Sequence, residues 1–147
     1  MSNVITKSKS EELVEALLNS GAMKLVENQI LVGKAIIKYM CKGDIFYLDV
    51  LTTAPECRKQ GHSKKAMNIL CDYAKQFDVT IELICGKVNK INPNVRMNVR
   101  MKGIDFASFN GTLTTDAIPV KDLPKFYSKF GFIKDGKINN KVKMKFN

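Results

Sequence analysis

The chain has 147 residues, of which 45% are hydrophobic and 26% are charged, and its formal net charge at pH 7 is +10. This length predicts one domain with its own core, and this balance of apolar and charged residues excludes an intrinsically disordered chain. The positive charge favours acidic partners, such as a phosphorylated cofactor, a nucleic acid or an acidic protein surface, but it does not choose among them.

The cysteines and the histidine do not form a recognisable metal or disulfide pattern. The chain contains four cysteines, at Cys41, Cys57, Cys71 and Cys85. No two of them have the paired spacing of a zinc site, and His62 is the only histidine that could join them. We therefore expect free thiols in a reducing compartment and no metal site.

No segment of the sequence is typical of a secretion signal or a membrane span. Residues 1–12 lack the apolar core of a signal peptide. The longest apolar stretch, residues 30–40, is interrupted by Lys34 and is too short to cross a bilayer. These features predict a cytoplasmic protein that does not associate with a membrane.

Hydrophobic periodicity predicts helices and strands over the first part of the chain. Ser8 and Glu11 fit a capping box, and an apolar helical face follows them. In chain order, the pattern predicts a helix over residues 8–21, an antiparallel pair of strands over 22–28 and 29–40, a strand over 43–53, a helix over 63–77 and a strand over 79–85. Because the last three elements make a βαβ crossover, their two strands should be parallel.

The pattern is weaker over residues 88–120, which we interpret as an insertion. Residues 95–101 alternate between apolar and polar side chains, which favours an amphipathic strand but leaves a helix open. Asn110 and Gly111 are typical of a hairpin turn.

The last part of the chain predicts a helix and a hairpin. The helix covers residues 123–130, with Asp122 as its N-cap and Gly131 as its terminator. The hairpin covers residues 131–146. Together with the earlier elements, they predict a single domain of mixed α/β class over residues 1–147.

The segment that joins the strand over 43–53 to the helix over 63–77 is suited to bind an anion. A helix begins with unpaired backbone N–H groups, and its dipole attracts negative charge to them. Gly61 would allow a phosphate to approach the backbone, and Lys64 and Lys65 add positive charge. The pattern suits a pyrophosphate, but it does not choose between a nucleotide, coenzyme A and free phosphate. A solvated turn in a lysine-rich chain is the alternative.

Two motifs resemble the GCN5-related N-acetyltransferases, the GNAT superfamily. The first is similar to the pyrophosphate-binding signature of that family, and its positions are held by Arg58, Lys59, Gln60, Gly61, His62 and Ser63. The second, residues 123–134, is similar to the family's late helix, where an aromatic-Tyr pair precedes a Gly-Phe that starts the next strand. The likeness covers residues 30–88 and 121–147, in the family's order of elements. It implies a central mixed sheet with splayed parallel strands and flanking helices.

The resemblance also implies that acetyl-CoA is the cofactor, and it assigns residues to hold it. Main-chain groups of one strand would bind the pantetheine arm in the gap between the splayed strands. The backbone N–H groups that begin the following helix would bind the pyrophosphate. The implied cofactor-binding residues are Leu51, Thr52, Thr53, Arg58, Lys59, Gln60, Gly61, His62, Ser63 and Lys64.

The implied reaction is transfer of an acetyl group to a primary amine, by direct attack through a tetrahedral intermediate. A backbone N–H near Leu51 would stabilise the oxyanion. Tyr127 would be the general acid that protonates the departing thiolate, unless it is a packing aromatic. Asp49 would be the general base, unless it pairs with a nearby lysine. We expect Glu82 to face solvent, and Cys57 has no evident base to activate it as a nucleophile.

Some positions depart from the family pattern. Ser63 stands where Gly or Ala is usual, which would put a hydroxyl near the phosphates. One of the family's two N-terminal helices is missing or reduced, and no residue matches the Asn that many members carry after the second parallel strand. Residues 88–120 also exceed the usual link. The acceptor side is therefore expected to be open, for a small molecule, a protein lysine or a nucleic-acid-linked amine.

A binding module that has lost the chemistry is the alternative function. In that case the charge of +10 would be the functional feature, and a basic surface would bind nucleic acid or an acidic protein. This surface would consist of Lys87, Lys90, Arg96, Arg100, Lys102 and the lysines from Lys137 to Lys145. The sequence leaves open the identity of the acceptor amine and whether the chain is a monomer or a homodimer.

Overall fold

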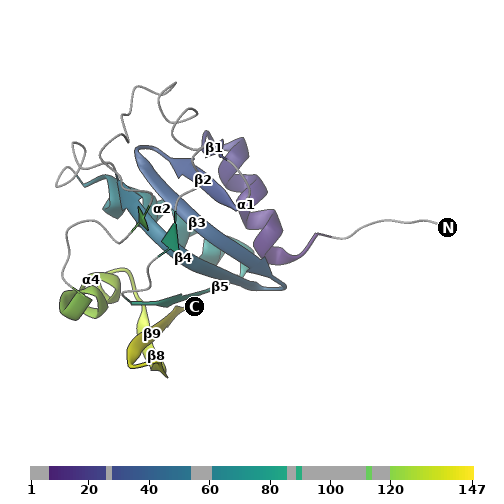
Figure 1. The fold of residues 1–147 in the computed structure, drawn as a ribbon. Helices are drawn as coiled ribbons and strands as arrows, with labels where there is room; N and C mark the ends of the chain where they lie inside the picture. Colours follow the sequence, from purple (N-terminus) through teal and green to yellow (C-terminus); the bar gives the residue numbers. More distant parts are fainter. Residues whose placement is uncertain (1–6, 26–27, 54–60, 86–88, 91–111, 114–119) are drawn as a thin grey trace.

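The computed structural model describes residues 7–25, 28–53, 61–85, 89–90, 112–113 and 120–147. Its elements are α1 (Lys9–Asn19), β1 (Met23–Lys24), β2 (Gln29–Val32), β3 (Ala35–Lys42), β4 (Ile45–Thr53), α2 (His62–Phe77), β5 (Thr80–Ile84), β6 (Asn89–Lys90), β7 (Thr112–Leu113), a 3₁₀ turn (Val120–Asp122), α4 (Leu123–Ser128), β8 (Ile133–Ile138) and β9 (Lys141–Phe146). Seven strands form one mixed sheet in the order β1-β2-β3-β4-β5-β9-β8, and α1 and α2 pack together against it (Figure 1). The predicted mixed α/β fold is confirmed.

The first helix begins where the sequence predicts. The Ser8 hydroxyl accepts a hydrogen bond from the backbone N–H of Glu11 at 3.3 Å, and the Glu11 carboxylate accepts one from the backbone N–H of Ser8 at 3.0 Å. These bonds satisfy two of the N–H groups that a helix start leaves unpaired. Leu13 and Leu17, on the apolar face, are buried against the sheet.

The run over residues 29–40, predicted as one strand, is instead part of a hairpin. β2 pairs antiparallel with β3, from Val32↔Ala35 outward, so that the chain reverses at Gly33 and Lys34. Gly33 has a φ of +63°, a left-handed conformation that glycine adopts without steric cost. The sequence did not predict this turn, because β2 and β3 are both buried and the residues on both sides of it are therefore apolar.

The predicted βαβ unit is confirmed. β4 and β5 are parallel, with register from Ile45↔Thr80 to Leu48↔Leu83, and α2 makes the crossover between them. The segment over residues 54–60, which enters α2, lies outside the described residues.

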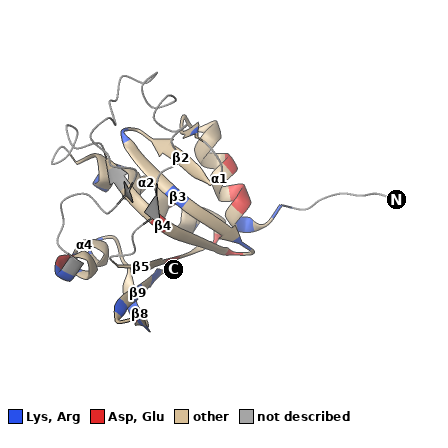
Figure 2. Ribbon diagram, viewed as in Figure 1, with Lys and Arg blue, Asp and Glu red and all other residues tan. Residues whose placement is uncertain are grey.

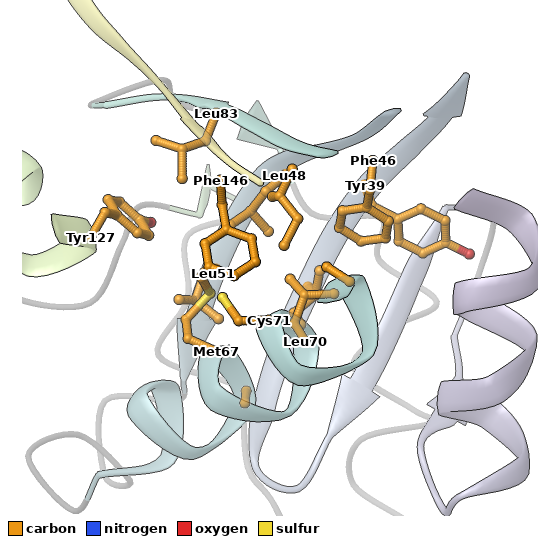
Figure 3. Close-up of a cluster of buried hydrophobic side chains, with 14 of the residues drawn as sticks. Tyr39, Phe46, Leu48, Leu51, Met67, Leu70, Cys71, Leu83, Tyr127 and Phe146 are labelled. Atoms are coloured by element: carbon orange, nitrogen blue, oxygen red, sulfur yellow. The ribbon is translucent and has the colours of Figure 1, made fainter. Parts of the chain in front are cut away.

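The hydrophobic core lies between the sheet and the two helices. Figure 3 shows Phe46, Leu48 and Leu51 of β4 beside Met67 and Leu70 of α2. All five side chains are buried. Full burial of a side chain of this size stabilises the fold by about 1.5–3 kcal/mol relative to exposure, so this layer fixes α2 against β4.

The C-terminal helix and hairpin also form as predicted. Asp122 is the residue before α4, but its side chain makes no capping hydrogen bond. The hairpin reverses at Asn139 and Asn140, which both have positive φ values of 50° and 64°, as a tight two-residue turn requires. β9 pairs with β5 on one side and with β8 on the other, so β8 is the edge strand.

The predictions for residues 95–101 and for the Asn110–Gly111 turn lie outside the described part of the chain. In that region the structure gives one short pairing, in which β6 and β7 are antiparallel. In the ranges given above, no helix has the length and apolar character to cross a membrane. The same ranges contain no group of three or more His, Cys, Asp or Glu side chains that could hold a metal ion.

Candidate functional site

The parallel strands β4 and β5 separate partway along their length. Their ladder ends at the pair Leu48↔Leu83, while β4 continues to Thr53 paired with β3 on its other side. Over the described residues, the edge of β4 beyond Leu48 therefore does not pair with β5. The end of the ladder agrees with the predicted splay of these two strands, and the main-chain groups of β4 beyond it can bind partners other than β5.

A β-bulge lies at the point where the strands separate. Lys38 pairs with Val50 and Tyr39 pairs with Leu48, so Asp49 is an extra residue in β4. A bulge bends its strand and increases the local twist. The bulge therefore bends β4 close to the point where its pairing with β5 ends.

Each predicted main-chain contact on β4 lies beyond this bulge. Leu51, Thr52 and Thr53 pair with residues of β3, and the side chains of Leu51 and Thr53 are fully buried. A ligand in the gap would thus meet the backbone of these residues rather than the side chains of Leu51 and Thr53.

The start of α2 differs from the start of α1. Gly61 is the N-cap of α2, with a φ of +79°, and it makes no side-chain capping bond. The first turn contains no acidic residue, whereas α1 has its capping box and two glutamates. Lys64 and Lys65 are exposed there. The positive end of the helix dipole and these two lysines would favour an anion at this position.

The signature residues fall into three groups. Arg58, Lys59 and Gln60 lie outside the described residues. His62 is partly exposed at the start of α2. The Ser63 side chain is 7% exposed and lies among the core-facing residues of α2, and the expectation that its hydroxyl lies near the phosphates stays a prediction.

Tyr127 is a buried residue of α4. Its ring makes an edge contact with Phe126, at 5.1 Å between centroids, and a tilted contact with Phe132, at 5.6 Å. It belongs to the same hydrophobic cluster as Leu51, and Figure 3 shows it extending from α4 toward that cluster. The fold thus places Tyr127 in the same core as Leu51 of β4, and its ring packs against its aromatic neighbours.

A cavity of about 200 Å³ lies at the end of the β4–β5 ladder. Its wall includes the last paired residues, Leu48 and Leu83. The other side chains that line it are Tyr47, Asp49, Glu82, Ile84, Ile138 and Lys143. Tyr47 and Glu82 lie beside one another in the ladder, and neither belongs to the core under α1 and α2. The cavity therefore opens on the face of the sheet opposite the helices.

Glu82 does not face solvent as the sequence predicted. Its side chain is 15% exposed, and its Oε1 accepts a hydrogen bond from Nζ of Lys143 at 3.0 Å. This hydrogen bond raises the pKa of the Lys143 ammonium above its ordinary value. Sequence reasoning missed Lys143 because the register that sets Ile84 opposite it, on β5 and β9, cannot be read from the alternation of residues.

No protein-family model matches the chain, and no curated protein sequence matches it. Solved structures do align with it. The crystal structure of the anti-CRISPR protein AcrVA5 aligns with a TM-score of 0.49 and 18% identity, over 81% of this chain and 96% of that chain. An acetyltransferase assigned to the GNAT family, from Bacteroides thetaiotaomicron, gives 0.49 and 16%, over 97% and 85%. An aminoglycoside 6′-N-acetyltransferase complexed with coenzyme A gives 0.45 and 16%, over 95% and 79%.

These likenesses are remote, and the chain's own topology establishes its fold. A bulged strand separates from its parallel neighbour, a helix that starts at a glycine connects the two, and a Tyr-bearing helix and a hairpin follow. This is the order of elements that the sequence motifs predict. The described elements therefore form a mixed α/β fold whose order agrees with the order that the resemblance to the GCN5-related N-acetyltransferases implies.

Proposed function

We propose that this protein is an acetyl-CoA-dependent N-acetyltransferase that acts on a primary amine. The observation that carries the proposal is the end of the β4–β5 ladder at Leu48↔Leu83, with β4 continuing to Thr53. Beyond this point the edge of β4 is not paired with β5, and the amides of a pantetheine arm could bind its main-chain groups as a strand would.

The residues around the gap fit coenzyme A at both ends. Beside the backbone of Leu51, Thr52 and Thr53, the uncapped start of α2 would hold the pyrophosphate. A Cβ built on Gly61 would meet no described atom within 4 Å, so there is open space in front of this glycine for a phosphate. Arg58, Lys59 and Gln60 remain predicted contacts from the sequence motif.

The roles of the chain's own groups follow from this arrangement. When bound, the thioester supplies the acetyl group. A backbone N–H near Leu51 would donate to the thioester oxygen as negative charge develops on it. Tyr127 would donate its hydroxyl proton to the departing sulfur, and Asp49, in the cavity on the opposite face, is the proposed acceptor of a proton from the amine.

Two variants of one residue test the cofactor site. Gly61→Asp and Gly61→Asn differ by a charge at nearly equal size, and both side chains tolerate a left-handed backbone better than others do. An aspartate would repel a pyrophosphate and also cap the helix with its own carboxylate. We expect Gly61→Asp to weaken coenzyme A binding at least tenfold relative to Gly61→Asn in calorimetry.

The same experiment includes an activity measurement. The wild-type protein should release free thiol from acetyl-CoA when primary amines are supplied. A wild-type protein that does not bind coenzyme A, or two Gly61 variants that bind it equally well, would contradict the proposed site.

A basic surface supports a second candidate, a module that binds nucleic acid. Residues 121–147 contain eight lysines and two aspartates, and Figure 2 shows basic residues on α4 and on the β8–β9 hairpin. All residues of β8 are exposed. Binding to a duplex RNA or DNA probe should then fall steeply between 50 and 200 mM salt. Tight binding to such a probe, with no binding of coenzyme A, would favour this candidate over the enzyme.

A further inference from the structure

The cavity at the end of the ladder contains an alkylammonium group that belongs to the chain itself. Nζ of Lys143 donates to Oε1 of Glu82 at 3.0 Å, and this lysine side chain is 28% exposed. Both groups line the cavity together with Asp49. The pocket that faces the gap between β4 and β5 is therefore already shaped and charged to hold a primary amine.

Lys143 has a second carboxylate within reach. Its Nζ lies 3.6 Å from Oδ2 of Asp135 on β8, whose side chain is 40% exposed. Asp135 does not line the cavity, whereas Glu82 does. The ammonium of Lys143 can therefore exchange a partner inside the cavity for one at its rim without losing its ion pair.

Glu82 depends on a cation more than an exposed carboxylate would. Its side chain is 15% exposed, and removing an ionised group from water is costly unless an opposite charge compensates it. If Lys143 moves to Asp135, another cation must take its place at Glu82. A protonated amine that enters the cavity supplies that cation.

We propose that Glu82 anchors the ammonium group of the acceptor, and that Lys143 occupies this position until the acceptor displaces it toward Asp135. The proposal rests on the proposed acetyltransferase function and defines its substrate class. The acceptor is an alkylamine that is protonated in solution, such as a lysine side chain or a polyamine, rather than an uncharged aromatic amine. Glu82 is thus a specificity-determining residue, and Lys143 is an internal competitor.

Substitutions of the three residues should change the affinity for an amine probe in different directions. Lys143→Met removes the competitor, so it should tighten binding of an amine probe several-fold. Asp135→Asn removes the alternative partner, so Lys143 stays on Glu82 and binding should weaken. Glu82→Gln removes the anchor and should weaken binding at least tenfold. The control is Lys24→Met, an exposed lysine of β1 at the other end of the sheet and outside the cavity wall, which should leave affinity unchanged.

The measurement is calorimetric titration of a blocked peptide with a single lysine into the protein, with and without coenzyme A, so that no reaction occurs. In steady-state thiol release with the same peptide, the variants should change KM for the peptide in the same directions. They should leave KM for acetyl-CoA unchanged. If the ion pair between Lys143 and Glu82 were only structural, Lys143→Met would weaken peptide binding, because breaking the pair would loosen the cavity.

The outcomes separate this inference from the proposed function. If acetyl transfer occurs but Lys143→Met and Asp135→Asn both weaken the peptide or both leave its affinity unchanged, the inference is overturned and the function stands. If the protein does not bind coenzyme A but the peptide titrations show the predicted signs, the amine subsite stands and the acetyltransferase assignment falls. An aniline derivative that binds as well as the lysine peptide would also overturn the inference.

Discussion

The hydroxyl of Tyr127 is attached to a ring that the fold holds firmly. The ring is 3% exposed and contacts Phe126 and Phe132. Tyr127→Phe keeps these contacts, so the free energy of unfolding should change by no more than the roughly 0.5–1.5 kcal/mol of one hydrogen bond. If the hydroxyl is the general acid, turnover should fall by about 10²–10⁴-fold.

Thiol release measures this turnover, and calorimetry should give an unchanged affinity for coenzyme A. Tyr73→Phe is the control, because Tyr73 makes a tilted ring contact with Phe77 at the opposite end of α2 from Gly61. Normal turnover by Tyr127→Phe would assign the residue to packing alone.

The buried thiol of Cys71 makes stability depend on pH above neutrality. Burial raises the pKa of Cys71 from about 9 to about 12, with a smaller contribution from Asp72. In the unfolded chain the thiol ionises near pH 9, whereas in the folded chain it stays protonated. The unfolded state thus binds fewer protons between these values, and stability is lost as pH rises through this window, by up to about 1.4 kcal/mol per pH unit for one thiol.

Urea unfolding at pH 8, 9, 10 and 11 tests this dependence. Cys71→Ala should lose stability less steeply than the wild type between pH 9 and 11, whatever its absolute stability. Parallel curves for the two proteins would show that Cys71 ionises alike in the folded and unfolded states.

At the scale of one element, the bulge in β4 lies where the pairing with β5 ends, and we expect it to open the gap. Since Lys38 pairs with Val50 and Tyr39 with Leu48, deleting Asp49 would make both pairs consecutive without moving either residue to another face. We expect the deletion variant to fold, because its register against β3 is preserved. Its β4 should be straighter and lie closer to β5, so coenzyme A affinity should fall at least tenfold in calorimetry.

Asp49→Ala is the matched control for this deletion, because it removes the carboxylate and keeps the extra residue. It should bind coenzyme A as the wild type does and lose only turnover. If the deletion and the substitution bind coenzyme A equally well, the bulge is not what holds the gap open.

The sequence predicts the elements better than it predicts their neighbours. A period of 3.6 residues identified α1 and α2, and the crossover rule gave the parallel orientation of β4 and β5. The turn at Gly33 was missed, because apolar residues on both sides look the same in one long strand and in a buried hairpin.

The same distinction holds for the candidate site: residues in a local motif could be predicted, whereas contacts between distant strands could not. A short motif sufficed to select Tyr127 and Gly61, since each stands at a fixed offset from a recognisable element. Glu82 alternates outward along β5, which in sequence reads as exposure. Its burial depends on β9, a strand far along the chain, which brings Lys143 to it.

At the scale of the whole molecule, Phe146 connects three parts of the structure. Its ring lies 5.4 Å from that of Phe132, beneath Nζ of Lys75 on α2 at 5.7 Å, and a Cβ added to Gly131 would lie 3.1 Å from it. Phe146→Ala should therefore lower the free energy of unfolding by about 3–5 kcal/mol.

Urea unfolding measures this loss, with Ile133→Ala as the control, since Ile133 is 59% exposed on the edge strand. The control should lie within about 0.5 kcal/mol of the wild type. A cost for Phe146→Ala no larger than that of the control would mean that the β8–β9 hairpin is not part of the cooperative core.

The position of β9 inside the sheet sets an order for assembly. β9 is the last strand in sequence, yet it lies between β5 and β8. The strands from β1 to β5 can pair before it docks, whereas β8 joins the sheet only through β9, and until β9 docks β5 offers a row of unpaired backbone groups. Such an open edge can accept a strand from another molecule as readily as from its own chain. Refolding at high concentration should therefore favour strand exchange between copies, and dilution should favour the closed monomer.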